Sequence, residues 1–168
     1  AVANRQGAMR KTSLFKPGLI PDLEGPILGF DLDVVVTGSL NEIWQMPADK
    51  IAMRHDWSEA RKGRPTGHGS VFRFDPARHG YLYEDLAKNP HAEVEKARGS
   101  EQCGTPRQAM DNDDFSCIPN ELVLSFKHDR LDLPPMNYLR QPRLPQNARV
   151  VCFHGRPKMP EVLAGYRG

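Results

Sequence analysis

The chain has 168 residues, a net charge of +2, 39% hydrophobic residues and 26% charged residues. This length suits one domain with a real hydrophobic core, and the composition excludes a disordered tail. No apolar run approaches the length of a membrane span, and residues 1–5 lack the apolar core of a signal peptide. The sequence therefore predicts a cytoplasmic protein without a membrane span.

The small charge excess does not call for a polyanionic partner, and we expect no nucleic acid partner. The three cysteines Cys103, Cys117 and Cys152 show no CxxC spacing, and their odd number argues against a disulfide framework or a zinc knuckle. We expect three reduced thiols, with Cys152 buried in a strand.

Predicted strands and helices alternate along the chain. Residues 1–25 are expected to form a loop or short helix, followed by strands at 26–30 and 34–36 whose continuous apolar run predicts burial on both faces. Ser39 is expected to cap a short helix at 41–44, with Glu42 at the capping-box position. The later predicted elements are strands at 51–54, 71–74, 122–126 and 149–153, helices at 81–88 and 101–110, a polar loop at 61–67 and a proline-rich connection at 133–145.

This alternation predicts an α/β fold in a single domain spanning residues 1–168. At the end of the first strand, Asp31 and Asp33 form an Asp-x-Asp pair. Open α/β folds bind ligands at the carboxyl edge of their strands, and two carboxylates there suit Mg²⁺ or Mn²⁺, which usually completes its shell with substrate phosphates. The alternative for so short a motif is a pair of turn residues.

A second enzyme class uses the same pattern. In a haloacid-dehalogenase-like phosphatase, Asp31 would be the nucleophile and Asp33 the general acid. Such an enzyme needs a later acidic motif that follows a strand and a glycine. The nearest candidate, residues 111–114, has neither before it.

A second polar motif follows the last predicted strand, where residues 154–158 read His-Gly-Arg-Pro-Lys. The imidazole of His154 can supply a third ligand to a transition metal. Gly155 permits close approach of a phosphate to the backbone, and Lys158 supplies a point charge for it.

With these motifs the chain resembles bacterial glycosyltransferases of the GT-A fold, which are distantly similar to glycogenin-like enzymes. The resemblance extends through most of the chain, and the order and spacing of its blocks are more specific than any one of them. The blocks are residues 14–18, 25–28, 31–40, 69–74, 101–102, 125–128 and 153–158.

The resemblance implies a partial GT-A (Rossmann-like) mixed sheet flanked by helices. It implies transfer of a sugar from a nucleoside diphosphate sugar, a UDP-sugar, to an unknown glycan or other acceptor. By the same resemblance, Mn²⁺ or Mg²⁺ is held by Asp31, Asp33 and His154, the donor diphosphate by Gly155 and Lys158, and the sugar pocket is lined by Gly69 and Ser70. Glu101 and Gln102 would lie beside the transferred sugar as the catalytic pair.

The chain departs from the family pattern at three places. His68 stands where an asparagine is usual, and Met159 where a proline is common. No strand is predicted before residue 27, so we expect a domain truncated at its N-terminus, without the βαβ region that holds base and ribose. Two non-enzyme alternatives remain: an inactive transferase remnant acting as a binding or structural module, and a basic nucleic-acid-binding module based on residues 61–64.

Overall fold

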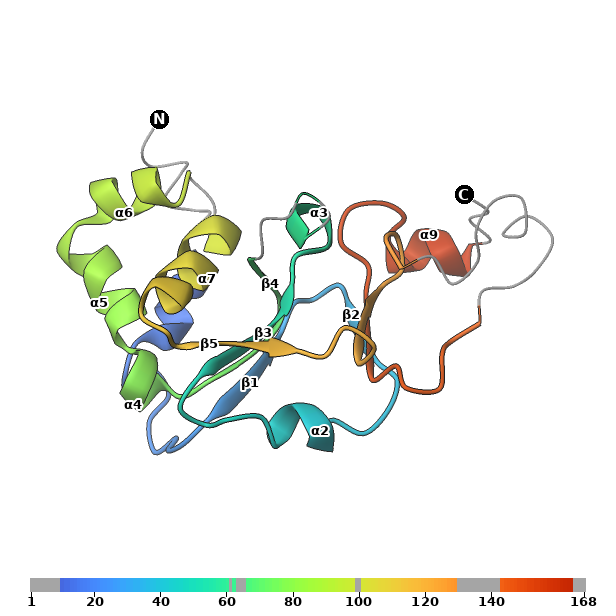
Figure 1. Cartoon of the computed structure of the whole chain (residues 1–168), viewed down its shortest axis with the longest axis horizontal. Helices are drawn as coiled ribbons and strands as arrows, with labels where there is room; N and C mark the ends of the chain where they lie inside the picture. The colour runs from blue at the N-terminus through green and yellow to red at the C-terminus, as the bar shows by residue number, and fades with distance from the viewer. Residues whose placement is uncertain (1–9, 61, 63–65, 99–100, 130–142, 165–168) are drawn as a thin grey trace.

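The structure, a computed structural model, describes residues 10–60, 62, 66–98, 101–129 and 143–164. Strands and helices interleave in these residues, as the α/β prediction requires (Figure 1). Every helix within them is too short or too polar to span a lipid bilayer.

The strands form two mixed sheets. Sheet A has the order β1-β4-β3-β5, with β1 (Ile27–Phe30) and β3 (Ile51–His55) antiparallel to β4 (Gly67–Phe74) and β3 parallel to β5 (Phe115–Ile118). Sheet B has the order β2-β7-β6, with β2 (Val34–Val36) antiparallel and β6 (Val123–Ser125) parallel to β7 (Val150–Cys152). The sheets meet where β1 of sheet A leads into β2 of sheet B.

The helices lie mainly at one end of the molecule. Figure 1 shows α4 (Pro76–His79), α5 (Tyr81–Lys88), α6 (Pro90–Lys96) and α7 (Glu101–Asp111) gathered on the side of sheet A away from sheet B. The 3-10 helix η1 (Arg10–Phe15) packs among them against α5 and α7. The short helices α2 (Asn41–Trp44) and α3 (Trp57–Ala60) follow β2 and β3, and α9 (Met159–Leu163) follows β7.

The alternation of side chains along sheet A sends them into two different clusters of the core. Ile51, Met53, Phe72 and Phe74 pack with Phe15 of η1 on one face. The other face contributes to a cluster that reaches into sheet B, made of Ile43, Ala52, Trp57, Val71, Ile118, Leu122, Val123, Val150 and Cys152. The prediction that Cys152 is buried is confirmed, and all three cysteines are free.

Most predicted elements are confirmed to within one residue at each end, and β4 begins four residues earlier than predicted. Five elements were not predicted, namely α3, α4, α6, α9 and β5. The expected burial of both faces is wrong for β2, because this strand lies at the edge of sheet B and leaves Val35 37% and Val36 50% exposed. Much of the proline-rich connection at 133–145 lies outside the described residues.

The expected cap of α2 is also wrong. The N-cap residue is Leu40, and it makes no side-chain capping bond. Ser39 precedes this N-cap residue by one position, and its hydroxyl accepts a hydrogen bond from the Asn41 amide (3.3 Å). The Glu42 carboxylate instead pairs with the Arg149 guanidinium at 2.9 Å, which ties α2 to sheet B.

Candidate functional site

Asp31 and Asp33 lie in the turn that joins the two sheets. The amide of Asp31 donates to the Ser70 carbonyl on β4 (3.0 Å), and the Asp33 carbonyl accepts from the Phe153 amide after β7 (2.8 Å). Leu32 between them is fully exposed, whereas both carboxylates are about a quarter exposed. Backbone bonds to both sheets therefore fix the acidic turn at the edge where β1, β3, β6 and β7 end.

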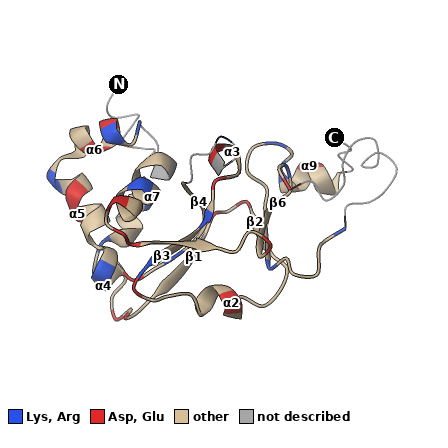
Figure 2. Cartoon of the chain, viewed as in Figure 1, with Lys and Arg blue, Asp and Glu red and all other residues tan. Residues whose placement is uncertain are grey.

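Each carboxylate is paired with a lysine from a distant part of the chain. Lys11 Nζ on η1 lies 2.6 Å from Asp31 Oδ1 and donates to the Gly69 carbonyl at 3.2 Å. Lys158 Nζ lies 2.9 Å from Asp33 Oδ2. Figure 2 shows acidic and basic residues close together where β2, β6 and α9 meet. The structure thus brings Asp33 and Lys158 together and adds Lys11, which belongs to none of the predicted site motifs.

His154 follows β7 and lies in a cluster of rings. Its ring centroid is 4.8 Å from those of Trp57 and His68 and 5.2 Å from that of His128. Burial, and then the His68 and His128 rings, lower the pKa of His154 to about 4, so its imidazole is neutral at pH 7. Its Nε2 is buried and has no hydrogen-bond partner among the described residues. These properties suit a metal or ligand-binding nitrogen.

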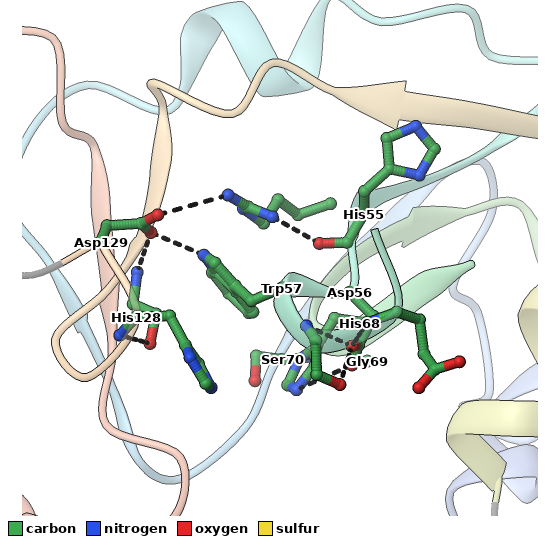
Figure 3. A network of polar contacts seen from close by, with 12 residues as sticks. His55, Asp56, Trp57, His68, Gly69, Ser70, His128 and Asp129 are labelled. Atoms are coloured by element: carbon green, nitrogen blue, oxygen red, sulfur yellow. Dashed lines mark hydrogen bonds and ion pairs between the residues drawn. The ribbon is translucent and has the colours of Figure 1, made fainter. Parts of the chain in front are cut away.

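Hydrogen bonds and a cation–π contact hold the Trp57 side chain of this cluster in place. The Trp57 indole donates to Asp129 Oδ2 (2.6 Å), which also accepts from the Ser125 amide (2.7 Å). The Arg54 guanidinium lies 4.0 Å over the indole ring and 3.7 Å from Asp129 Oδ1. Figure 3 shows Trp57 between the Asp129 turn and the His68–Ser70 end of β4.

His68 packs against both Trp57 and His154 in this cluster. Its Nδ1 accepts from the Ser70 amide (3.3 Å), and its Nε2 lies 4.0 Å from Asp56 Oδ2. Burial is the main cause that lowers the pKa of His68. Asp56 is itself fixed at the start of α3, where its carboxylate accepts from the Ser58 and Glu59 amides (Figure 3). His68, which stands where the similar glycosyltransferases usually have an asparagine, is therefore held in a fixed position within the site.

The remaining predicted site residues differ in how far the structure describes them. Gly69 and Ser70 are buried in β4, beside the acidic turn. Gly155 has a φ of +80°, a conformation that favours glycine. Glu101 and Gln102 begin α7, which packs on β4, but their side chains lie outside the described part of the chain, and their catalytic role stays a prediction.

The predicted metal ligands fit a divalent cation by their chemistry, since two carboxylates and a neutral imidazole are donors for Mn²⁺ or Mg²⁺. The orphaned Nε2 of His154 agrees with such a role. Within the described residues, however, no group of three or more His, Cys, Asp and Glu side chains is arranged to hold a metal ion. A cation would therefore have to replace the ammonium groups of Lys11 and Lys158.

The acidic segment that a phosphatase would need lies elsewhere. The Asp114 carbonyl accepts from the Ile51 amide (2.6 Å) at the start of β3, whereas Asp31 lies beyond the end of the parallel-running β1. Residues 111–114 and the Asp-x-Asp pair are thus at opposite ends of sheet A. This geometry argues against the two-carboxylate phosphatase site.

Comparison with solved structures places the fold among glycosyltransferases. The chain is similar to the galactosyltransferase LgtC in complex with donor and acceptor sugar analogs (TM-score 0.58, 16% identity, covering 88% of this chain and 58% of that chain). It is similar to the active-site mutant Q189E of LgtC (TM-score 0.59, 16% identity, 89% and 59%). The glycosyltransferase GlyE of Streptococcus pneumoniae TIGR4 is a further neighbour (TM-score 0.56, 14% identity, 88% and 37%).

The chain therefore shares the mixed α/β fold of these enzymes and spans about three-fifths of the LgtC chains. The predicted fold class is confirmed by this likeness. No protein-family model and no curated protein matches the chain.

Proposed function

We propose that this chain is a metal-dependent glycosyltransferase, or a segment of one, that uses a nucleoside diphosphate sugar, a UDP-sugar, as donor. The observation that carries the proposal is the meeting of Asp31, Asp33, His154, Gly155 and Lys158 at one edge of a glycosyltransferase-like fold. These residues come from two motifs more than a hundred residues apart in the sequence.

The roles follow from the chemistry of the groups. Asp31, Asp33 and the neutral His154 would hold Mn²⁺ or Mg²⁺, and a cation bound there would offset the charge that develops on the diphosphate leaving group. Lys158, once released from Asp33, would bind a diphosphate oxygen, and Gly155 would let that oxygen approach the backbone. The fixed Trp57 would exclude water from one side of the site.

Glu101 and Gln102 are proposed as the groups beside the transferred sugar, and Gly69 and Ser70 as part of its pocket. Ser70 is buried, with 1% of its surface exposed. The acceptor is proposed to be a glycan or other hydroxyl compound.

Titration of the protein with Mn²⁺ in a calorimeter, followed by UDP, tests the metal and diphosphate site. We expect Asp31→Asn and Asp33→Asn each to weaken Mn²⁺ binding at least about tenfold, because each removes one charged oxygen ligand. UDP binding should then lose its dependence on Mn²⁺.

Asp49→Asn is the matched control, since Asp49 is an exposed aspartate on a turn outside the site. It should bind Mn²⁺ as the unaltered protein does. Absence of metal-dependent UDP binding by the unaltered protein, or equal binding by the Asp31 and control variants, would contradict the proposed function.

The inactive-remnant alternative is separated from the enzyme by turnover. An active transferase with Mn²⁺ releases UDP from one member of a panel of UDP-sugars, by slow hydrolysis or by transfer. A remnant binds Mn²⁺ and UDP without any release of UDP.

A further inference from the structure

Three lysines approach the acidic turn and the glycine after His154. Lys11 forms an ion pair with Asp31 and a hydrogen bond to the Gly69 carbonyl, and Lys158 forms an ion pair with Asp33. The third is Lys127, which is exposed and makes no hydrogen bond or ion pair with the other described residues. Its ammonium group is therefore the one that needs no rearrangement before it can meet an anion.

The parallel pairing of sheet B brings Lys127 to Gly155. Ser125 pairs with Cys152, and the Phe126 amide donates to the Cys152 carbonyl (3.0 Å). The rings of Phe126 and Phe153 then stack with centroids 5.0 Å apart. Because β6 and β7 are parallel and end side by side, the residues that follow the two strands lie at the same edge of sheet B.

The backbone around Lys127 is fixed by a turn. The Asp129 amide donates to the Ser125 carbonyl (3.0 Å), and the His128 amide donates to Ser125 Oγ (3.1 Å). The Asp129 carboxylate returns to the Ser125 amide and is held by Trp57. His128 and Asp129 thus face the ring cluster and Trp57 (Figure 3). Lys127, between Phe126 and His128, is exposed.

The Lys127 ammonium group lies beside the face of Gly155 that a side chain would otherwise cover. A Cβ built on Gly155 would lie 3.7 Å from Lys127 Nζ and 4.0 Å from its Cδ. A phosphate oxygen that approaches the backbone at Gly155 would therefore come within reach of the ammonium group. An ammonium group is a compact charge with three donors, which binds phosphate oxygens without a fixed geometry.

We propose that Lys127 is a further donor-binding residue, whose ammonium group contacts the diphosphate beside Gly155. This inference rests on the proposed function, because it assumes that the diphosphate lies at Gly155. Lys127 would supply its charge at once, whereas Lys158 becomes available only when Asp33 releases it.

The test uses the full chain with inorganic pyrophosphate as the probe, so that no nucleoside contact is needed. Calorimetric titration at saturating Mn²⁺ compares the unaltered protein with Lys127→Met, Lys127→Arg and the control Lys88→Met. Lys88 is an exposed lysine on α5, far from the site, and it pairs with Glu84. Mn²⁺ binding is also measured without pyrophosphate.

Lys127→Met should weaken pyrophosphate binding about tenfold, because a charge-assisted contact to phosphate is lost. Lys127→Arg should retain binding to within about threefold, and Lys88→Met should match the unaltered protein. Mn²⁺ binding alone should stay unchanged or tighten slightly in Lys127→Met, since the variant removes a positive charge.

Two results would overturn the inference, and only one of them would also overturn the proposed function. If the unaltered protein binds Mn²⁺ and pyrophosphate and Lys127→Met binds both equally well, the role of Lys127 fails and the proposed function stands. If the unaltered protein binds neither, the proposed function fails and the role of Lys127 fails with it.

Discussion

At the scale of single residues, His154 is a neutral side chain close to the charged groups of the acidic turn. The rings of Trp57, His68 and His128 surround its imidazole, and burial is the largest cause of its lowered pKa. A proton on this ring would be placed next to two other imidazoles in a partly buried position. The fold therefore stabilises the state in which His154 can offer a lone pair.

Lowering the pH should destabilise the protein through His154. Its pKa is about 4 in the native protein and about 6.5 in an unfolded chain, so between these values the unfolded chain binds a proton that the native one does not. The stabilising effect of the neutral ring is complete above about pH 6.5 and is lost as the pH falls towards 4. One such proton contributes a slope of at most about 1.4 kcal/mol per pH unit.

The measurement is the free energy of urea unfolding, followed by circular dichroism at several pH values. His154→Gln should lose less stability between pH 6.5 and 4 than the unaltered protein. His91→Gln, at an exposed position on α6, should keep the unaltered slope. Parallel curves for His154→Gln and the unaltered protein would show that His154 is not the group responsible.

Of the site's residues, those in short motifs were predictable from the sequence. Asp31, Asp33, His154 and Lys158 follow strands with strong apolar runs, so their arrival at one edge follows from strand direction. The partners that hold them were not predictable. Lys11 reaches Asp31 because η1 packs beside sheet A, and no local pattern around a single lysine encodes that contact.

At the scale of elements, η1 is a short helix that completes the core of sheet A. Phe15 at its end is 1% exposed, and its ring lies 4.3 Å from that of Phe74 and 6.2 Å from that of Phe72. The same helix carries Lys11 to Asp31. Packing of one aromatic side chain thus positions a charged group of the site.

Phe15→Ala should lower the free energy of unfolding by about 3 kcal/mol, because it leaves a cavity between η1 and sheet A. Leu14→Ala is the neighbouring control and should cost less than about 1 kcal/mol, since Leu14 is 38% exposed. Urea denaturation followed by circular dichroism measures both. Equal losses in the two variants would mean that Phe15 does not anchor η1.

The elements missed by the sequence analysis divide into two kinds. Local signals existed for missed helices such as α3, α4 and α6. Asp56 accepts from the amides that open α3, and Asp75 and Asn89 cap helices that begin with Pro76 and Pro90. The strand β5 carried no such signal. Its four residues include Ser116 and Cys117, and its conformation is set by parallel pairing with β3, a contact that is distant in the sequence.

At the scale of the whole molecule, one buried arginine joins the two sheets. Arg54 on β3 donates through Nε to the Val123 carbonyl on β6 (3.0 Å) and through Nη1 to the His55 carbonyl (2.6 Å). The same guanidinium lies beside Asp129 and over Trp57. One side chain therefore contacts sheet A, sheet B and the ring cluster.

Arg54→Met should lower the free energy of unfolding by about 3 kcal/mol, since it leaves buried acceptors and a carboxylate without their partner. Arg149→Met removes a more exposed ion pair with Glu42 and should cost about 1 kcal/mol or less. Thermal and urea unfolding followed by circular dichroism compare the two. A smaller loss for Arg54→Met than for Arg149→Met would contradict its role as the link.

The position of Trp57 has an optical consequence. The chain has two tryptophans, of which Trp57 is 4% exposed against three imidazoles and Trp44 is 46% exposed. Indole emission shifts to the blue in a dry environment and is quenched by a protonated imidazole in contact with it. We therefore expect the part of the tryptophan emission that comes from Trp57 to change when the imidazoles around it become protonated.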